Sequence, residues 1–369
     1  MKILVTGGAG FIGSHLVTEL VARGHRVRAL DILEPQVHGA AGGARLPAGV
    51  ELIRGDVRDR STVAGALQEV EAVFHEAALV GVGQSMYQIE RYVSANTLGG
   101  AVLLDVLANS RHRPRKLVVA SSMSIYGEGA YVCATCGPQN PELRSDEQLA
   151  RRDWELRCPS CAASLAAAPT PESKPILPTS VYAITKRDHE ELFLVIGRAY
   201  GIPTVALRYF NVYGRGQALA NPYTGVAAIF SARLLNGHPP VVFEDGRQTR
   251  DFVHVSDIVQ ANLLALETER AEGVFNVGTG RPTSVLRVAQ VLGGLLAPDA
   301  EPEVVGQFRA GDIRHCVADI TKIRAELGYE PRVTFEDGMA DLVTWVRRQQ
   351  APDHFEASRA ELEAHGLTR

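Results

Sequence analysis

Short apolar runs alternate with amphipathic segments along much of the chain. Residues 2–6 are an apolar run that ends in glycines, and residues 11–23 follow with apolar residues at helical spacing. Further apolar runs occupy residues 26–31, 51–54, 72–75, 116–121 and 204–209. Apolar strands separated by helices are typical of a parallel sheet covered on both faces. The pattern predicts an α/β fold with a doubly wound sheet, in which ligands bind beyond the carboxyl ends of the strands.

Two kinds of segment interrupt this pattern. Residues 128–174 are rich in Cys, Pro and Glu and have little apolar periodicity, which indicates an inserted module, whereas the mixed loops further on suit a smaller α/β substrate-binding lobe. We expect a first α/β domain over 1–127, the insertion over 128–174 and a continuation of the first domain over 175–210. The lobe's first part is expected over 211–249, a return to the first domain over 250–276, the lobe's second part over 277–350 and a polar tail over 351–369.

Composition narrows the function classes. The 369 residues are 46% hydrophobic and 22% charged, as in ordinary globular proteins, and they suffice for one large domain and a smaller one. A net charge of -4 gives no basic field for nucleic acid, so we expect a small-molecule partner. No apolar run has the length of a signal-peptide core or a membrane span. We therefore expect no membrane association and a cytoplasmic location, where cysteines stay reduced.

Three glycines follow the first predicted strand in the motif TGGAGFIG. Gly7 permits a tight turn, Gly10 lets the backbone approach a pyrophosphate, and Gly13 allows close packing of helix against strand. The N-terminus of the following helix offers free N–H groups and a partial positive charge to an anion. Three glycines alone are a weak signal, but their place between a strand and a helix predicts a Rossmann-type dinucleotide site.

Two acidic residues refine the expected cofactor. Asp31 ends the second predicted strand, where a carboxylate accepts hydrogen bonds from the adenosine ribose and repels a 2′-phosphate, so NAD is favoured over NADP. Asp56 follows the third strand in GDVRD, where it can bind the adenine amino group, although an Asp that starts a turn is also common for local reasons.

Tyr182 and Lys186 lie four residues apart at the start of a predicted helix that Ser180 can cap, so both side chains lie on one face. A phenol with an ordinary pKa near 10 is a poor base, but a neighbouring ammonium and a positive nicotinamide ring favour its phenolate. Tyr182 is thus a candidate general base. By itself this spacing is common on exposed helices.

Together these features resemble the extended short-chain dehydrogenase/reductase family, in its NAD-dependent nucleotide-sugar epimerase and dehydratase branch. The resemblance covers nearly the whole chain and rests on TGGAGFIG, Asp31, GDVRD, HEAA at 75–78, SSMSIYG at 121–127, YAITK at 182–186, RYFNVYG at 208–214, RDFVHV at 250–255 and RAGDIRH at 309–315.

The resemblance implies a role for each matching residue. Ser122 is the expected catalytic hydroxyl, Tyr182 the base and Lys186 the cation that lowers the pKa of Tyr182. Tyr209 is expected on the nicotinamide side of NAD, and the other implied NAD contacts are Gly7, Gly10, Phe11, Ile12, Gly13, Asp31, Asp56, Val57, Ala77, Ala78, Asn96, Tyr182 and Lys186. The implied contacts of the nucleotide sugar are Ser124, Asn211, Phe243, Arg250, Arg309 and Asp312, whose arginines and amide suit a diphosphate or ribose. A homodimer is implied through helices near 96–109 and 181–200.

Two departures from the family pattern bear on the reaction. Family dehydratases follow the catalytic hydroxyl with an Asp and a Glu that help to expel water, whereas this chain has Met123 and Ser124. We therefore predict an epimerase, in which a ring carbon is oxidised to a transient ketone and reduced on its other face, so that NAD is regenerated. Galactose epimerases of the family often have a Lys where this chain has Val80, which makes a simple galactose-epimerase assignment doubtful.

Four cysteines in the insertion have the spacing C-x2-C-x21-C-x2-C: Cys133, Cys136, Cys158 and Cys161. Two such pairs predict a structural four-thiolate zinc site, and hence a zinc-ribbon-like insertion. The insertion leaves the chain between Ser122 and Tyr182, so it is expected beside the active site. With PTSVYAITKR and NPYTGVAAIF, it is most similar to the dTDP-L-rhamnose 4-epimerase group of the family, which implies a dTDP-6-deoxysugar substrate.

Other functions remain open at this point. A UDP-sugar 4-epimerase, acting on UDP-glucose, UDP-galactose or UDP-glucuronate, fits the same motifs. A dTDP-4-keto-sugar reductase would release NADP, which Asp31 disfavours. A binding protein that has lost its chemistry is disfavoured by the intact Ser122, Tyr182 and Lys186. A nucleic-acid-binding zinc ribbon is disfavoured because acidic residues offset the arginines between the two cysteine pairs.

Overall fold

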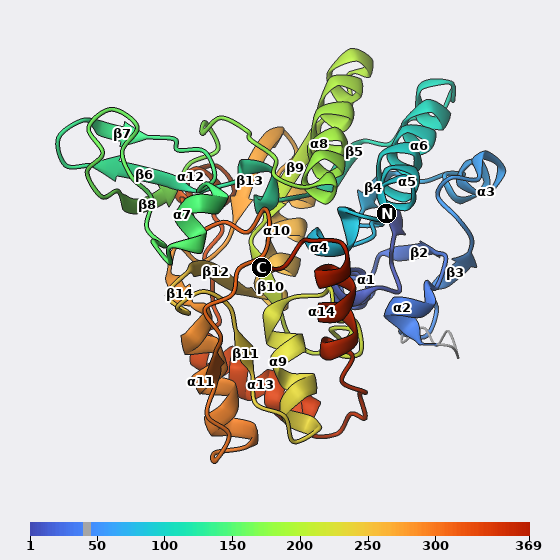
Figure 1. Ribbon diagram of the computed structural model, residues 1–369. Helices are drawn as coiled ribbons and strands as arrows, with labels where there is room; N and C mark the ends of the chain where they lie inside the picture. The colour runs from blue at the N-terminus through green and yellow to red at the C-terminus, as the bar shows by residue number, and fades with distance from the viewer. Residues whose placement is uncertain (40–45) are drawn as a thin grey trace.

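A seven-stranded parallel sheet forms the larger domain of the computed structural model, which describes residues 1–39 and 46–369 (Figure 1). Its strand order is β13-β9-β5-β4-β1-β2-β3. The strands are β1 (Lys2–Thr6), β2 (Arg26–Asp31), β3 (Glu51–Arg54), β4 (Ala72–His75), β5 (Lys116–Ser122), β9 (Thr204–Tyr209) and β13 (Gly273–Val277). The strand order reverses between β1 and β4, so a ligand crevice is expected at their carboxyl ends. The predicted Rossmann-type doubly wound sheet is confirmed.

Helices cover both faces of this sheet because successive strand residues point to opposite sides. Ile3 and Val5 of β1 belong to one core cluster, with α1 (Phe11–Ala22) and α10 (Val255–Glu267). Leu4 belongs to the opposite cluster. That second face carries α3 (Arg60–Ala66), α6 (Gly99–Ala108) and α8 (Val181–Tyr200). Further helical segments of this domain are α2 (Pro35–His38), α4 (Val82–Ser85), α5 (Ile89–Tyr92), α12 (Thr321–Leu327), a π-helical turn over Val93–Leu98 and a 3-10 turn over Met123–Tyr126.

A second sheet joins the smaller lobe to the insertion. It runs β10 (Asn211–Tyr213), β12 (Thr249–His254), β16 (His315–Ala318), β8 (Ala166–Thr170), β6 (Ala130–Cys133) and β7 (Gly137–Gln139), and β14 (Pro282–Ser284) pairs with β12. We expected residues 250–276 to return to the first domain, but β12 bonds to β10, β14 and β16 of the lobe, and the return consists of α10 and β13. Below this sheet in Figure 1 lie α9 (Val226–Leu235), α11 (Val285–Leu296), α13 (Phe335–Val346) and a ladder of β11 (Val241–Val242) with β15 (Glu303–Val304).

The insertion is a small arm at the opposite end of the molecule from α3 and β3 (Figure 1). β6 pairs antiparallel with β7 and β8, and α7 (Asp146–Ala150) precedes the second cysteine pair. The arm's own core is small and comprises Tyr131, Cys133, Leu156, Cys158 and Leu165. Because β8 pairs in parallel with β16, the arm is continuous with the lobe.

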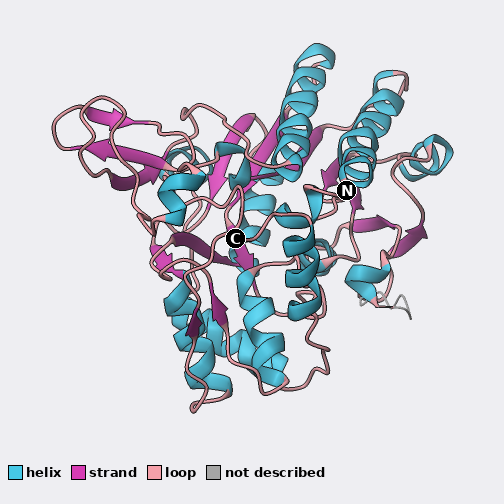
Figure 2. Cartoon of the chain, viewed as in Figure 1, coloured by secondary structure: helices cyan, strands magenta, loops and turns pink. Residues whose placement is uncertain are grey.

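The expected polar tail is an ordered segment that contains α14 (Phe355–Ala364), seen beside α4 in Figure 2. Phe355 is buried against Val241 and Phe243 of the lobe, and Leu362 is buried against Gly83 of α4, so the helix packs on both domains. Arg369 exchanges two backbone hydrogen bonds with Phe308, and the N–H of Ala310 donates to the carbonyl oxygen of Leu367. Within the part of the chain that the structure describes, every helix is too short or too polar to cross a membrane.

Candidate active site

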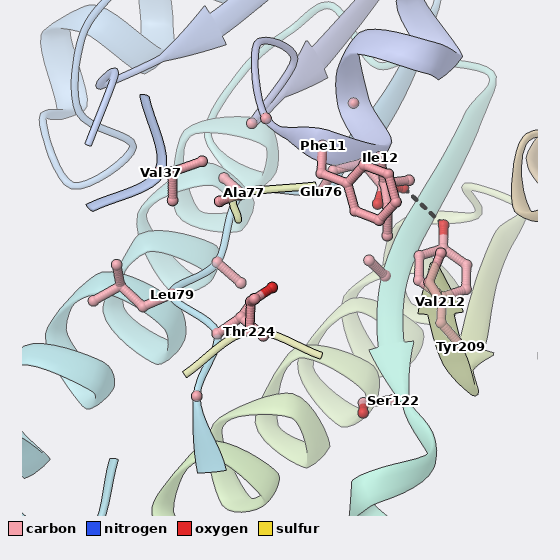
Figure 3. A pocket seen from close by; sticks show the side chains of 18 of the residues that line it. Phe11, Ile12, Val37, Glu76, Ala77, Leu79, Ser122, Tyr209, Val212 and Thr224 are labelled. Carbon is pink, nitrogen blue, oxygen red and sulfur yellow. Dashed lines mark hydrogen bonds between the residues drawn. The ribbon is translucent and has the colours of Figure 1, made fainter. Parts of the chain in front are cut away.

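A cavity of about 490 Å³ lies at the carboxyl ends of β1, β2, β4, β5 and β9. The glycine loop forms one wall, and Figure 3 shows Phe11, Ile12, Glu76 and Tyr209 on this side of the cavity. Most of the predicted NAD contacts line it, namely Gly7, Gly10, Phe11, Ile12, Gly13, Asp31, Asp56, Val57, Ala77, Ala78, Tyr182, Lys186 and Tyr209.

The turn at Gly7 and the close packing at Gly13 have the steric character that the sequence predicts. Gly7 adopts a φ of 67°, and a Cβ there would lie 2.7 Å from the backbone nitrogen of Ala77. A Cβ on Gly13 would lie 2.1 Å from the carbonyl oxygen of Gly7, so only glycine lets the helix start this close to the strand. α1 begins at Phe11 without a side-chain cap, so its first N–H groups are available to an anion. This geometry suits a dinucleotide pyrophosphate.

The two acidic residues differ in their surroundings. Asp31 is buried at the cavity wall, and its two oxygens accept hydrogen bonds from the backbone N–H groups of Ala9 (2.9 Å) and Leu33 (2.8 Å). These bonds fix the carboxylate and leave lone pairs for ribose hydroxyls. Asp56 is instead paired with Arg58, whose hydrogen bonds lower the pKa of the Asp56 carboxyl. This position is compatible with binding of the adenine amino group by Asp56 and also with a purely local function of Asp56 in the turn.

Ser122, Tyr182 and Lys186 converge on the same cavity. Ser122 ends β5, and its Oγ lies 2.9 Å from the Oγ of Ser124, a predicted sugar contact that also lines the cavity. Ser180 caps α8 by accepting a hydrogen bond from the N–H of Ala183, as expected. This cap starts the helix so that Tyr182 and Lys186 face the end of β5, where Lys186 Nζ donates to the carbonyl oxygen of Ala120 at 2.8 Å.

Burial dominates the proton affinities of this group. It raises the pKa of Tyr182 to about 12, and the Ser122 hydroxyl opposes this rise. It lowers the pKa of Lys186 to about 8, although the Glu76 carboxylate favours the charged ammonium. The expected lowering of the pKa of Tyr182 is therefore not achieved by the protein groups alone, because desolvation of the phenolate outweighs the hydrogen bond with Ser122.

Glu76 is a cavity residue to which the sequence analysis assigned no role. It follows β4, and its Oε1 accepts a hydrogen bond of 2.8 Å from the Tyr209 hydroxyl, the dashed line in Figure 3. Asn262 donates to the same hydroxyl at 2.7 Å. Burial raises the pKa of Glu76 to about 7, against the opposing effects of Tyr209 and Lys186. The motif HEAA at 75–78 could have pointed to Glu76, because it places an acidic residue directly after an apolar strand.

Some predicted contacts lie elsewhere. Asn96 is fully buried, and its amide bonds to the backbone N–H and carbonyl of Leu79 and to Thr185, so it supports the cavity wall from behind. Asn211 lines the cavity. Among the described residues, four predicted sugar-nucleotide contacts are outside the cavity lining: Phe243, Arg250, Arg309 and Asp312.

Three of these four residues contact one another. The Arg309 guanidinium lies over the Phe243 ring, 4.9 Å from its centroid, and Arg309 Nε donates to Asp312 Oδ2 at 2.9 Å. Arg250 is near the same segment, since it donates to the carbonyl oxygens of Ile313 (2.6 Å) and Arg314 (3.0 Å). The structure thus forms a second group of candidate ligands, distinct from the NAD cavity.

The four cysteines of the insertion also converge. Their Sγ atoms all lie within 4.8 Å of one another, and the Cys133 and Cys161 sulfurs are 3.5 Å apart. Two sulfurs of a tetrahedral zinc site with Zn–S bonds of about 2.3 Å are separated by about 3.8 Å. The side-chain positions are therefore compatible with one shared metal ion.

Comparison with known proteins identifies the class. The model of the NAD dependent epimerase/dehydratase family matches residues 3–147 and 159–278. The dTDP-L-rhamnose 4-epimerase of Burkholderia thailandensis is 35% identical over 352 residues, which cover 94% of this chain and 95% of that protein. The UDP-glucose 4-epimerase of Thermotoga maritima, solved with UDP-glucose, has a TM-score of 0.76 at 32% identity and covers 94% of this chain and 99% of its own. The Thermus thermophilus UDP-glucose 4-epimerase, solved with NAD, has a TM-score of 0.73 at 33% identity, with coverages of 95% and 100%.

The chain belongs to the NAD dependent epimerase/dehydratase family, within the extended short-chain dehydrogenases/reductases. The prediction of an NAD-dependent nucleotide-sugar epimerase is confirmed at this level. The resemblance on which the residue assignments rest is likewise confirmed.

Proposed function

We propose that the enzyme inverts carbon 4 of a nucleotide-activated sugar, and that its substrate is a dTDP-6-deoxysugar such as dTDP-L-rhamnose. The assignment of the reaction type rests on the convergence of Ser122, Tyr182 and Lys186 on the NAD cavity. Met123 and Ser124 stand where dehydratases of the family have acidic residues, which favours an epimerase. The sugar assignment is supported by the similarity to the Burkholderia enzyme over nearly the full length of both chains.

In this proposal Tyr182 accepts the proton of the sugar 4-hydroxyl, and Ser122 hydrogen-bonds the same oxygen. Bound NAD supplies the hydride acceptor and then the hydride donor, and its positive ring favours the Tyr182 phenolate. Lys186 follows Tyr182 by one turn of α8 and lines the same cavity, where the Ala120 carbonyl holds its Nζ. When the ketone is reduced on its other face, Tyr182 returns the proton, and the net reaction changes only the configuration.

A UDP-sugar 4-epimerase is the second candidate, favoured by structural similarity to the Thermotoga enzyme in complex with UDP-glucose. Purified protein without added cofactor is to be incubated with dTDP-L-rhamnose, UDP-glucose, UDP-galactose and UDP-glucuronate, and the products identified by NMR. We expect the 4-epimer of the dTDP-sugar to form fastest. Faster epimerisation of a UDP-sugar rejects the sugar assignment, and the absence of any epimer across the panel rejects the proposed reaction.

We predict that Asp31→Ala weakens NAD retention and reduces discrimination against NADP. The reason is that the Asp31 carboxylate, held by Ala9 and Leu33, would bind the ribose hydroxyls and repel a 2′-phosphate. The measurement is the NAD content of purified protein and its affinity for both cofactors. Asp56→Ala, at the same cavity edge, is the matched control and should keep the preference for NAD. Equal binding of both cofactors by the unmodified enzyme contradicts the prediction.

We also propose that the insertion binds one structural zinc ion through Cys133, Cys136, Cys158 and Cys161. The convergence of the four sulfurs and the small core around them support this. A homodimer through α6 and α8 is proposed too, since Leu98, Ile184 and Val195 at these helices expose 49%, 41% and 59% of their surface. The cytoplasmic location stays a prediction.

A further inference from the structure

One buried arginine connects the insertion to the smaller lobe. Arg144 lies between β7 and α7, and its side chain is only 1% exposed. Its two terminal nitrogens each donate to a different carboxylate oxygen of Glu244, both at 2.9 Å. One of them also donates to the backbone carbonyl oxygen of Asp312 at 3.2 Å. Arg144 therefore contacts two separate lobe segments at once.

Both of these segments carry candidate nucleotide ligands. Glu244 directly follows Phe243, and Asp312 accepts the hydrogen bond from Arg309. Since the Arg309 guanidinium lies over the Phe243 ring, Phe243, Arg309 and Asp312 form one group. Phe243 comes from one lobe segment, and Arg309 and Asp312 come from the other. Arg144 contacts both segments and so fixes their positions relative to each other.

The backbone conformation of Glu244 indicates that contacts with other segments hold this residue in place. Its φ is 54°, in the left-handed region that side chains other than glycine rarely adopt. The side chain is 4% exposed and receives a second arginine, Arg314, at 2.9 Å. Two buried guanidinium groups on one carboxylate compensate its desolvation and fix its position. We expect that loss of one of them lets Glu244 relax and shifts its neighbour Phe243.

Other charged residues of the insertion bind the same lobe segment. Glu128 accepts a hydrogen bond from the backbone N–H of Arg314 at 2.7 Å. Glu155 accepts from the Arg314 guanidinium at 2.6 and 3.1 Å. The insertion therefore makes directional, charge-assisted contacts with residues 312–315, beside Arg309.

We propose that Arg144 is a positioning residue through which the insertion sets the nucleotide end of the substrate site. Through its ion pair with Glu244, Arg144 fixes the position of Phe243. Through its hydrogen bond to the Asp312 carbonyl, it fixes the Arg309–Asp312 pair. The ligand that this group would bind is a nucleoside diphosphate. The inference rests on the proposed function and on the family resemblance, which implies that Phe243, Arg309 and Asp312 contact the nucleotide sugar. The insertion is thus part of the binding site without touching the reacting carbon.

The test is the Arg144→Ala variant, titrated with dTDP and with UDP by calorimetry. We expect both nucleotides to bind about tenfold more weakly or worse, because the ligand group loses its fixed geometry. In turnover assays KM should rise by a similar factor while kcat stays within about twofold, since the contacts act on ground state and transition state alike. Bound NAD should be unchanged.

Two further variants separate positioning from general destabilisation. Arg144→Lys keeps a positive charge beside Glu244 but not the planar fork, so it should recover part of the lost affinity. Arg157→Ala removes an exposed arginine of the same insertion, which pairs with Asp153 at 3.4 Å, and should bind both nucleotides like the unmodified enzyme. If Arg144→Ala does not fold, the test is carried by Arg144→Lys, whose nucleotide affinity must fall.

The outcomes are distinguishable. Unchanged affinity for both nucleotides in a folded Arg144→Ala protein, or a loss confined to kcat, overturns the positioning role and leaves the proposed function intact. Nucleotide binding that depends on Arg144 in an enzyme that epimerises none of the sugars rejects only the proposed reaction. Failure of the unmodified protein to bind either nucleotide overturns both.

Discussion

Replacement of Tyr182 by Phe should lower turnover by about 10²-fold or more, the usual contribution of a positioned acid–base group. The ring would still fill its site on α8, so NAD and substrate should bind nearly as before. The measurement is the rate of 4-epimer formation at saturating substrate, together with the NAD content. Tyr200→Phe, which removes a phenol hydroxyl at the other end of the same helix, is the control and should keep full turnover.

The pH dependence gives this prediction a second readout. Burial raises the pKa of Tyr182 to about 12, so the protein groups alone keep the phenol protonated at neutral pH. A base must be deprotonated to act, and its phenolate fraction rises with pH until the pKa is reached. The kcat of the unmodified enzyme should therefore rise with pH from neutrality toward about 8, above which Lys186 loses its charge, and Tyr182→Phe should abolish this limb. Nearly full turnover in the variant would remove Tyr182 from the proton transfer.

The first domain could be predicted from sequence because its signals are local. The apolar runs from Lys2–Thr6 to Thr204–Tyr209 became the expected strands, and the steric contacts of Gly7 and Gly13 require glycine. These residues are constrained by neighbours within a few positions or on the adjacent strand. Their pattern is therefore visible without the fold.

What sequence alone could not provide depends on long-range contacts. Arg144 and Glu244 are 100 residues apart, and no periodicity relates an arginine in a loop to an acid in another lobe. The position of β12 was mispredicted for the same reason, since its apolar residues fit either sheet and only pairing with β10 and β16 decides. Likewise the sign of the pKa change at Tyr182 depends on burial, which the spacing to Lys186 does not report.

The second large effect is expected at the cysteines of the insertion. Replacing Cys133 and Cys136 by Ser should abolish the binding of one zinc ion per chain, because half of the four converging sulfurs are lost. The core of the insertion is small and includes Cys133 itself, so metal binding should supply much of its folding free energy. The variant's insertion should become sensitive to protease, while the first domain stays folded and keeps NAD.

The same double variant should also lose affinity for the nucleotide sugar, because an unfolded insertion no longer presents Arg144 to Glu244. The measurements are zinc content by elemental analysis, Zn–S distances by X-ray absorption, expected at about 2.3 Å in the unmodified protein, and proteolysis followed by mass spectrometry. Cys316→Ser is the matched control, since this buried cysteine lies outside the cluster of four and should leave zinc in place. Protein prepared under reducing, zinc-replete conditions that holds no zinc would refute the site. Wild-type activity in the zinc-free double variant would refute only its connection to substrate binding.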